Sequence, residues 1–185
     1  MSAWHNFTDF FLDVVETIAI SLVILVIIIA FIARPHKVDG PSMQPTLLHD
    51  DVILTDKISY AFNPINRGDI VVFHAPHDPE KRDFIKRVIG LPYETITLQG
   101  GAVYINNQLF HEPYLSDKTS NGSTFLKDNS TVSLGQDEYF VMGDNRSVSS
   151  DSRSWGAVSK KSIVGRAFVI YWPITRWQSI QHYQL

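Results

Sequence analysis

The first 33 residues of this 185-residue chain contain one long apolar run. Residues 17–33 read T-I-A-I-S-L-V-I-L-V-I-I-I-A-F-I-A without a charge. With Val14 and Val15, and with Glu16 at the membrane interface, the run has about twenty residues, enough to cross a bilayer as a helix. In lipid the backbone has no other way to satisfy its hydrogen bonds within the segment. The pattern therefore predicts one transmembrane helix over residues 14–33, after a short tail of residues 1–13.

A cleaved signal peptide would show a similar run. The region before the run is acidic rather than basic, and the residues at −3 and −1 before Arg34 are Phe31 and Ala33. A bulky Phe fits poorly to the small-x-small cleavage pattern. We therefore interpret the run as a retained anchor.

From Asp51 onward the apolar positions recur with a period of two, which is typical of strands. The segments with this pattern are residues 51–59, 69–75, 83–90, 95–98, 103–105, 138–142 and 162–172. The turn Gln99-Gly100-Gly101-Ala102 indicates a hairpin, and the polar stretch 116–135 predicts a loop with one short strand near residues 131–134. Without sustained helical periodicity after residue 34, the sequence predicts an all-β body, folded as a barrel or as packed sheets.

Composition excludes several classes of partner and chemistry. The net charge is −3, the pI is about 6.1 and no long basic run exists, so nucleic acid is not an expected partner. The chain has no cysteine, which excludes disulfides, thiol nucleophiles and Cys-ligated metals. Only His74, His77 and Asp78 resemble a metal cluster, and a solvated turn around Pro76 and Pro79 explains them better. We therefore expect no metal and no cofactor.

Ser42 is the candidate nucleophile. It lies in the stretch D-G-P-S-M-Q-P-T-L-L, residues 39–48, where Gly40, Pro41 and Pro45 prevent helix formation. A serine hydroxyl becomes a useful nucleophile only beside a base. The sequence leaves three kinds of base open, namely a histidine in a Ser-His-Asp arrangement, a neutral lysine or a carboxylate.

Lys86 is the candidate lysine base, in the middle of the strand F-I-K-R-V-I-G. To act near neutrality, a lysine must lose about 2–3 units from its ordinary pKa of about 10.4. Burial away from carboxylates supplies such a shift, and strand alternation gives Lys86 the apolar neighbours Phe84 and Val88 on its face. The alternative is an edge-strand lysine that points to solvent.

A polar stretch, residues 143–153, reads G-D-N-R-S-V-S-S-D-S-R between two apolar strands. Taken alone it is typical of an exposed turn. A polar loop held between core strands also often forms part of a site.

Together these stretches resemble the bacterial type I signal peptidases. The resemblance is carried by four motifs in order after one anchor, namely G-P-S-M-Q-P-T-L (residues 40–47), R-G-D-I-V-V-F (67–73), K-R-V-I-G-L-P (86–92) and G-D-N-R with D-S-R (143–146 and 151–153). It implies a membrane-bound serine endopeptidase that removes signal peptides from exported preproteins by cutting after small residues at −1 and −3.

The resemblance also implies residue roles. Ser42 matches the nucleophile, Lys86 the general base and Ser149 the serine that orients the lysine. The residues that match the scaffold of the site are Asp144, Asn145, Arg146, Asp151 and Arg153. The residues that match the substrate pocket are Met43, Leu47, Phe84 and Ile85.

Two positions depart from the family pattern. Some relatives carry a serine two residues before the nucleophile that helps bind the oxyanion, and here that position is Gly40. The Ser42 N–H remains as one backbone donor, with a Gly40 backbone group or a water as a candidate second donor. Ser147-Val148 stands where many relatives have Asp-Asn, but the spacing to Ser149 and Asp151 is kept.

The resemblance implies a division of the chain into an anchor, a β body and a smaller lobe. The expected parts are a catalytic β domain in a partly open barrel (residues 34–93 and 138–175), a small β lobe (94–137) and a C-terminal tail (176–185). The expected partners are preprotein signal peptides and the lipid bilayer. The expected location is the cytoplasmic membrane, single-pass, with the catalytic body on the extracytoplasmic side.

Charge predicts the opposite orientation, because Arg34, His36 and Lys37 follow the apolar run and the positive-inside rule would place them in the cytoplasm. We give the family pattern precedence, since the cleavage site of an exported substrate emerges on the other face. Two further functions fit parts of the sequence. One is a self-cleaving Ser–Lys peptidase, although such proteins lack an anchor. The other is a membrane-tethered, non-enzymatic β domain that binds a surface ligand.

Overall fold

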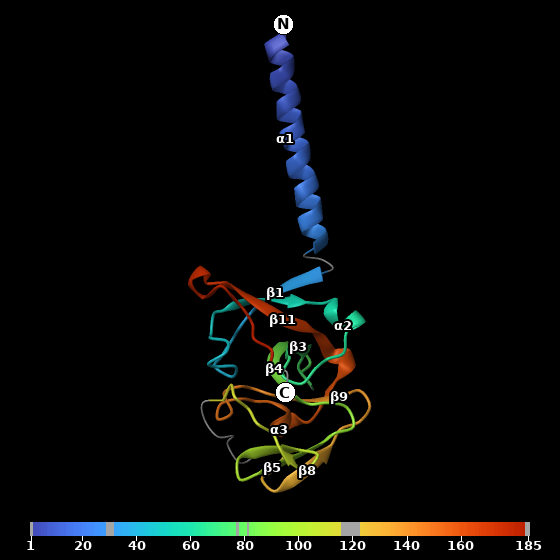
Figure 1. The fold of residues 1–185 in the computed structure, drawn as a ribbon, viewed down its shortest axis with the longest axis vertical. Helices are drawn as coiled ribbons and strands as arrows, with labels where there is room; N and C mark the ends of the chain where they lie inside the picture. Colours follow the sequence, from blue (N-terminus) through green and yellow to red (C-terminus); the bar gives the residue numbers. More distant parts are fainter. Residues whose placement is uncertain (1, 29–31, 77, 81, 116–122, 184–185) are drawn as a thin grey trace.

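The N-terminal helix stands apart from the body of the protein (Figure 1). The computed structural model describes residues 2–28, 32–76, 78–80, 82–115 and 123–183. Helix α1 (Ser2–Ile27) is exposed along its described side chains, and Asp9–Ile27 is long and apolar enough to cross a membrane. The next strand already begins at Ala33, the last residue of the expected span, and residues 29–31 lie outside the described residues.

The larger of the two sheets has eight strands. They are β1 (Ala33–Lys37), β2 (Val52–Asp56), β3 (Ile70–His74), β4 (Asp83–Gly90), β9 (Glu138–Met142), β10 (Val158–Ser159), β11 (Ile163–Trp172) and β12 (Gln178–Ser179). Their order is β1-β2-β11-β3-β4-β9-β10, and β12 pairs with β11 as well. The long strand β11 therefore pairs with three other strands, β2, β3 and β12.

The smaller sheet lies at the end of the body farthest from α1 (Figure 1). Its strands, in the order β7-β6-β5-β8, are β7 (Gln108–Leu109), β6 (Ala102–Ile105), β5 (Thr95–Gln99) and β8 (Ser130–Ser133). Alternate residues of β5 and β6 are buried, which is the period-two pattern expected from the sequence. These side chains share one apolar cluster with Ile89 and Phe140 of the larger sheet, so the two sheets pack against each other.

The all-β expectation is confirmed, since every strand pairing in both sheets is antiparallel. Among the described strands no barrel closes. The larger sheet nevertheless curls, because His36 Nε2 of β1 lies 3.1 Å from Asp83 Oδ2 of β4 although three strands separate β1 and β4 in the sheet order. The curl leaves an open space between the residues after β1 and the start of β4.

The structure contains short elements that the sequence pattern did not predict. The expected strand 51–59 ends at Asp56, and Ser59–Phe62 forms the one-turn helix α2. A second one-turn helix, α3 (Ser152–Trp155), lies in the polar stretch, and the 3₁₀ turns η2 (Lys160–Ser162) and η3 (Ile174–Arg176) flank β11. Such elements are too short to show a period, and β1 was hidden at the end of the apolar run.

Asp56 ends β2 by capping the turn that follows. Its carboxylate accepts hydrogen bonds from the Ile58 and Ser59 amides, at 2.8 and 3.0 Å, and from the Ser59 hydroxyl. Burial acts to raise the pKa of Asp56, but the bonds from Ser59 and Ile58 outweigh it, and the pKa is lowered. A carboxyl with a lowered pKa stabilises the fold above its unfolded pKa and loses this effect as pH falls through the folded pKa.

We predict that Asp56→Ala lowers the free energy of unfolding at neutral pH by about 0.5–2 kcal/mol, because the cap is lost. The difference from wild type should shrink below about pH 4 as Asp56 becomes protonated. Urea unfolding in detergent at several pH values measures it. Glu80→Ala removes a carboxylate that is 77% exposed and serves as the control. An equal loss in both variants would contradict the capping role.

Candidate active site

Ser42 lies in the loop between β1 and β2, residues 38–51, here called the nucleophile loop after the predicted role of Ser42. Two backbone bonds between Val38 and residues 50–51 close its base, at 2.8 and 3.0 Å. Inside the loop, the Leu47 amide donates to the Met43 carbonyl at 2.9 Å. Met43 and Leu47 are buried in the core cluster of the larger sheet. These two apolar side chains anchor the loop and leave the Ser42 hydroxyl half-buried at the surface.

Lys86 points at Ser42 from strand β4. Its Nζ atom lies 2.9 Å from Ser42 Oγ and 3.0 Å from the Ile85 carbonyl oxygen, and the residue is 5% exposed. Burial lowers the pKa of Lys86 to about 8, while the charges of Asp151 and Asp144 act in the opposite direction. The structure thus brings together the predicted nucleophile and the predicted base.

Both acids that act on Lys86 are paired with arginines. The two oxygens of Asp151 accept from Arg153 at 2.8 Å each, and those of Asp144 accept from Arg87 at 2.8 and 2.7 Å. Fork-shaped pairs of this kind offset the carboxylate charge locally. The lysine can therefore lose its proton although two acids lie nearby.

The polar stretch 143–153 packs against the loop that carries Ser42. The Asn145 amide donates to the Ser42 carbonyl at 3.0 Å, and the Gly143 amide donates to Asp151 at 3.0 Å. Arg146 pairs with Glu112 and donates to the Gly143 carbonyl at 3.0 Å. The five expected scaffold residues, Asp144, Asn145, Arg146, Asp151 and Arg153, thus form connected networks around the nucleophile loop.

Ser149 lies close to Ser42, but among the described residues its hydroxyl is bonded to neither Ser42 nor Lys86. Its Oγ is buried and has no hydrogen-bond partner among the described residues. A Cβ added to Gly143 would lie 2.3 Å from this Oγ and 2.4 Å from the Ser42 carbonyl oxygen. Gly143 thus allows both serines to approach the same point of the backbone.

The backbone amides of Ser42 and Gly40, the two expected oxyanion donors, differ in their hydrogen bonding. Within the described part of the chain, the Ser42 amide donates no hydrogen bond, whereas the Gly40 amide donates to His49 Nδ1 at 3.1 Å. Gly40 has a φ of +86°, a conformation that glycine adopts without strain. One backbone donor is therefore free at Ser42, and the Gly40 donor is engaged.

A groove of about 320 Å³ runs beside the pair, in the open space between β1 and β4. One wall consists of residues 37–39 with Ser42 and Met43, and the other of residues 82–86. Val148 and Ser150 of the polar stretch complete it. Of the expected pocket residues, Met43, Phe84 and Ile85 line this groove. Leu47 does not, because it lies in the core behind Met43.

The histidines near the groove contact acids. His74 Nδ1 lies 2.7 Å from Asp83 Oδ1, on the same carboxylate that contacts His36. Across the described residues, no three His, Asp or Glu side chains are arranged to hold a metal ion. His77, the other histidine of the sequence cluster, lies outside the described residues.

Two residues of the site, Arg87 and Thr46, were not among the site residues expected from the sequence. Arg87 is fully buried on the face of β4 opposite Lys86, and Thr46 donates to Asp144 at 2.6 Å from within the nucleophile loop. Strand alternation next to a buried Lys86 could have located Arg87, since its side chain then has to enter the interior on the other face. Its carboxylate partner could not be read from the sequence.

In this site the hydroxyl of the half-buried Ser42 is hydrogen-bonded to the buried amine of Lys86 beside an open groove, an arrangement compatible with a serine nucleophile and a lysine base. The family model described as "Signal peptidase, peptidase S26" matches residues 11–172. The chain therefore belongs to the signal peptidase family, peptidase S26, and is a serine peptidase.

Several relatives named signal peptidase I are similar to this chain over most of their length. Signal peptidase I of Leptolyngbya laminosa is 40% identical over 168 residues, which is 88% of this chain and 80% of that protein. Signal peptidase I P of Bacillus subtilis subsp. natto is 33% identical over 89% of this chain and 91% of its own. Signal peptidase IB of Staphylococcus aureus is 32% identical over 90% and 92%. The similarity thus covers both the helix and the β body.

The pKa of Lys86 is the property of the site that can be measured most directly. We predict that Lys86 Nζ titrates near pH 8 in the folded protein, because burial disfavours its charged form. NMR of reductively ¹³C-methylated protein follows the titration, and loss of the signal in Lys86→Ala assigns it. A midpoint near 10.4, the ordinary lysine value, would contradict the burial argument.

Proposed function

We propose that this protein is a membrane-anchored endopeptidase that removes signal peptides from exported preproteins, with Ser42 as nucleophile and Lys86 as general base. The observation that carries the proposal is the 2.9 Å contact between Lys86 Nζ and Ser42 Oγ inside a buried site. The names of the relatives support the substrate class. No cofactor is required for this chemistry.

The lowered pKa makes Lys86 usable as a base. With a pKa of about 8, roughly a tenth of the lysine is neutral at pH 7, a few hundred times more than for an ordinary lysine. Neutral Lys86 accepts the Ser42 proton as Oγ attacks the scissile carbonyl carbon. The resulting ammonium then protonates the leaving amine, and Lys86 activates the water that releases the acyl group.

The charge that develops on the substrate oxygen requires hydrogen-bond donors. The Ser42 amide supplies one, since it is not bonded within the described chain. For Gly40 to act as the second donor, its amide must exchange the His49 ring nitrogen for the oxyanion. A missing donor costs on the order of 10²-fold in rate. The rate of cleavage therefore depends on whether the Gly40 amide is released from His49.

Ser149 is the proposed orienting residue for Lys86. Its buried hydroxyl has no partner among the residues that the structure describes, and Gly143 brings it to the same point of the backbone as Ser42. A buried hydroxyl without a partner is unfavourable, so a hydrogen bond from the charged Lys86 amine would stabilise both groups. Through this bond Ser149 holds the ammonium until it donates its proton.

The groove provides the proposed substrate site. Residues 37–39 and β4 could each pair with an extended peptide, which would add the substrate as a strand between them. Met43, Phe84 and Ile85 then present a shallow apolar surface to alternate substrate side chains, with Leu47 supporting Met43 from the core. We propose that small residues at −1 and −3 are selected in this way.

The anchor places this groove near the bilayer. Residues 37–39 continue the chain from the end of β1, and β1 begins at Ala33, shortly after α1 (Figure 1). A signal peptide presents its cleavage point just beyond its own apolar stretch, so enzyme and substrate meet in one plane. We propose a single-pass protein with the body on the extracytoplasmic side, where the cleavage sites of exported proteins emerge.

The direct test is cleavage of a model preprotein with an Ala-x-Ala site by the full-length protein in detergent. We expect wild type to cut after the second Ala, and Ser42→Ala and Lys86→Ala each to lose on the order of 10³-fold or more in kcat/KM. Lys160→Ala, which changes an exposed lysine, should behave as wild type. N-terminal sequencing identifies the cut.

Other results of the cleavage assay would each favour a different function. Loss in Ser42→Ala alone would keep the peptidase and exclude Lys86 as the base. Cleavage of its own chain but not of the preprotein would favour a self-cleaving Ser–Lys peptidase. A folded wild type without any cleavage would favour a non-enzymatic, membrane-tethered β domain.

A further inference from the structure

Residues 178–183, here called the C-terminal segment, lie against the nucleophile loop from the side opposite the groove. The segment begins as β12 on β11, and the Ile180 amide donates to the Phe168 carbonyl at 2.9 Å. The Ile180 side chain is buried in the same apolar cluster as Met43 and Leu47. The segment therefore packs on the two residues that anchor the nucleophile loop.

The end of the segment is fastened to the turn before β3. The Ile70 amide donates to His182 Nδ1 at 3.3 Å, and the same ring nitrogen lies 3.4 Å from Asp69 Oδ1. The Tyr183 carbonyl lies so close to Gly68 that a Cβ on Gly68 would be 1.9 Å from the oxygen. Gly68 also has a φ of +87°, so the close approach depends on glycine.

This attachment places the Tyr183 ring on Arg87. The Arg87 guanidinium carbon lies 5.5 Å from the centre of the Tyr183 ring and 4.1 Å from that of Tyr114. The two rings lie 5.4 Å apart, and Arg87 is fully buried. Its remaining contacts include the Gly68 carbonyl at 2.9 Å and both oxygens of Asp144. Tyr183 and Tyr114 are thus the two aromatic rings that contact the guanidinium, in addition to its bonds to Asp144.

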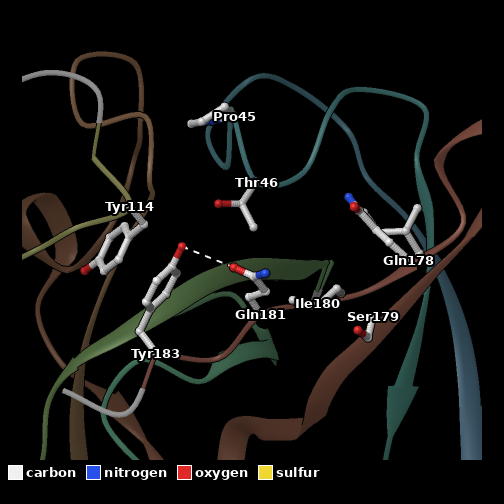
Figure 2. Close-up of a pocket in the computed structure, with 9 residues that line it drawn as sticks. Pro45, Thr46, Tyr114, Gln178, Ser179, Ile180, Gln181 and Tyr183 are labelled. Atoms are coloured by element: carbon white, nitrogen blue, oxygen red, sulfur yellow. Dashed lines mark hydrogen bonds between the residues drawn. The ribbon is translucent and has the colours of Figure 1, made fainter.

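Arg87 is connected to the nucleophile through Asp144. Asp144 accepts from Thr46, four residues after Ser42, and the next residue, Asn145, donates its amide to the Ser42 carbonyl. Figure 2 shows Thr46 of the nucleophile loop across a small cavity from Tyr114, Tyr183 and Gln181, whose amide oxygen accepts from the Tyr183 hydroxyl at 3.4 Å. A displacement of Arg87 would therefore act on Ser42 through two connections, the Asp144–Thr46 bond and the bond from the Asn145 backbone amide to the Ser42 carbonyl.

We propose that Tyr183 is a positioning residue for the reaction. Its ring holds Arg87, Arg87 holds Asp144, and Asp144 with Thr46 fixes the distance between Ser42 Oγ and Lys86 Nζ. This inference rests on the proposed function for its kinetic effect, because Tyr183 itself touches neither the reacting atoms nor the groove. Its structural effect on the nucleophile loop does not depend on turnover.

The kinetic test compares Tyr183→Ala with Tyr183→Phe in the full-length protein. Because a small misplacement of reacting groups is costly, we expect Tyr183→Ala to lower kcat about tenfold and to change KM by less than about twofold. Tyr183→Phe keeps the ring on Arg87 and should restore kcat. Trp177→Ala truncates a side chain that is 71% exposed in the same region and should leave kcat unchanged.

A purely structural role would give a different result. If Tyr183 only stabilised the fold, Tyr183→Ala would lower the midpoint of thermal unfolding but regain wild-type kcat at temperatures well below that midpoint. Combining Tyr183→Ala with Thr46→Val tests the connection, since residues that act in one network have non-additive effects. Additive losses in kcat, or a recovery in the cold, would overturn the proposal.

Amide hydrogen exchange tests the positioning without any catalysis. The Leu47 amide is bonded to the Met43 carbonyl inside the nucleophile loop. We expect its exchange to accelerate about tenfold or more in Tyr183→Ala, and to match wild type in Tyr183→Phe and Trp177→Ala. Unchanged exchange in Tyr183→Ala would refute the proposal even if the enzyme is active. A wild type that cleaves no preprotein would refute the proposed function, and exchange would still decide the role of Tyr183.

Discussion

The site depends on a buried amine whose neighbouring carboxylates are already engaged. Lys86 loses its proton readily because it is shielded from water, and a free carboxylate beside it would reverse that effect. Asp144 and Asp151 are both close enough to act on it, yet Arg87 and Arg153 hold them in two-pronged pairs. The buried ion pairs thus have a chemical consequence beyond stability, since they allow a neutral lysine in a region that contains several acids.

Strand β4 makes this arrangement possible because its neighbouring residues point to opposite faces. Lys86 faces the groove and Ser42, while Arg87 faces the interior and binds Asp144. The polar stretch 143–153 binds both β4, through Asp144 on Arg87, and the loop that carries Ser42, through the Asn145 backbone amide on the Ser42 carbonyl. The same strand thus carries both the predicted base, Lys86, and Arg87, which binds the polar stretch through Asp144.

The sequence predicted the parts of the fold that repeat, and it indicated which side chains would meet at the candidate site. Period-two patterning located β4, β5 and β11, and the motifs indicated Ser42 and Lys86 as partners, whose roles stay predictions. The pattern missed β1 and β12, because a strand at the end of an apolar run and a two-residue strand show no period of their own. It also missed how residues 178–183 contact Arg87, since the sequence does not show contacts between distant segments. Leu47, expected at the pocket, faces the core.

The most direct test of this account is the pH dependence of kcat/KM for cleavage of a preprotein by wild type. If neutral Lys86 is the base, activity must fall as pH decreases through the pKa of the free enzyme, which the buried environment sets at about 8. The account predicts an acid limb with slope one and a midpoint near 8. A midpoint near 6.5, the ordinary value for histidine, or activity that is unchanged from about pH 6 to 9 would contradict lysine as the base.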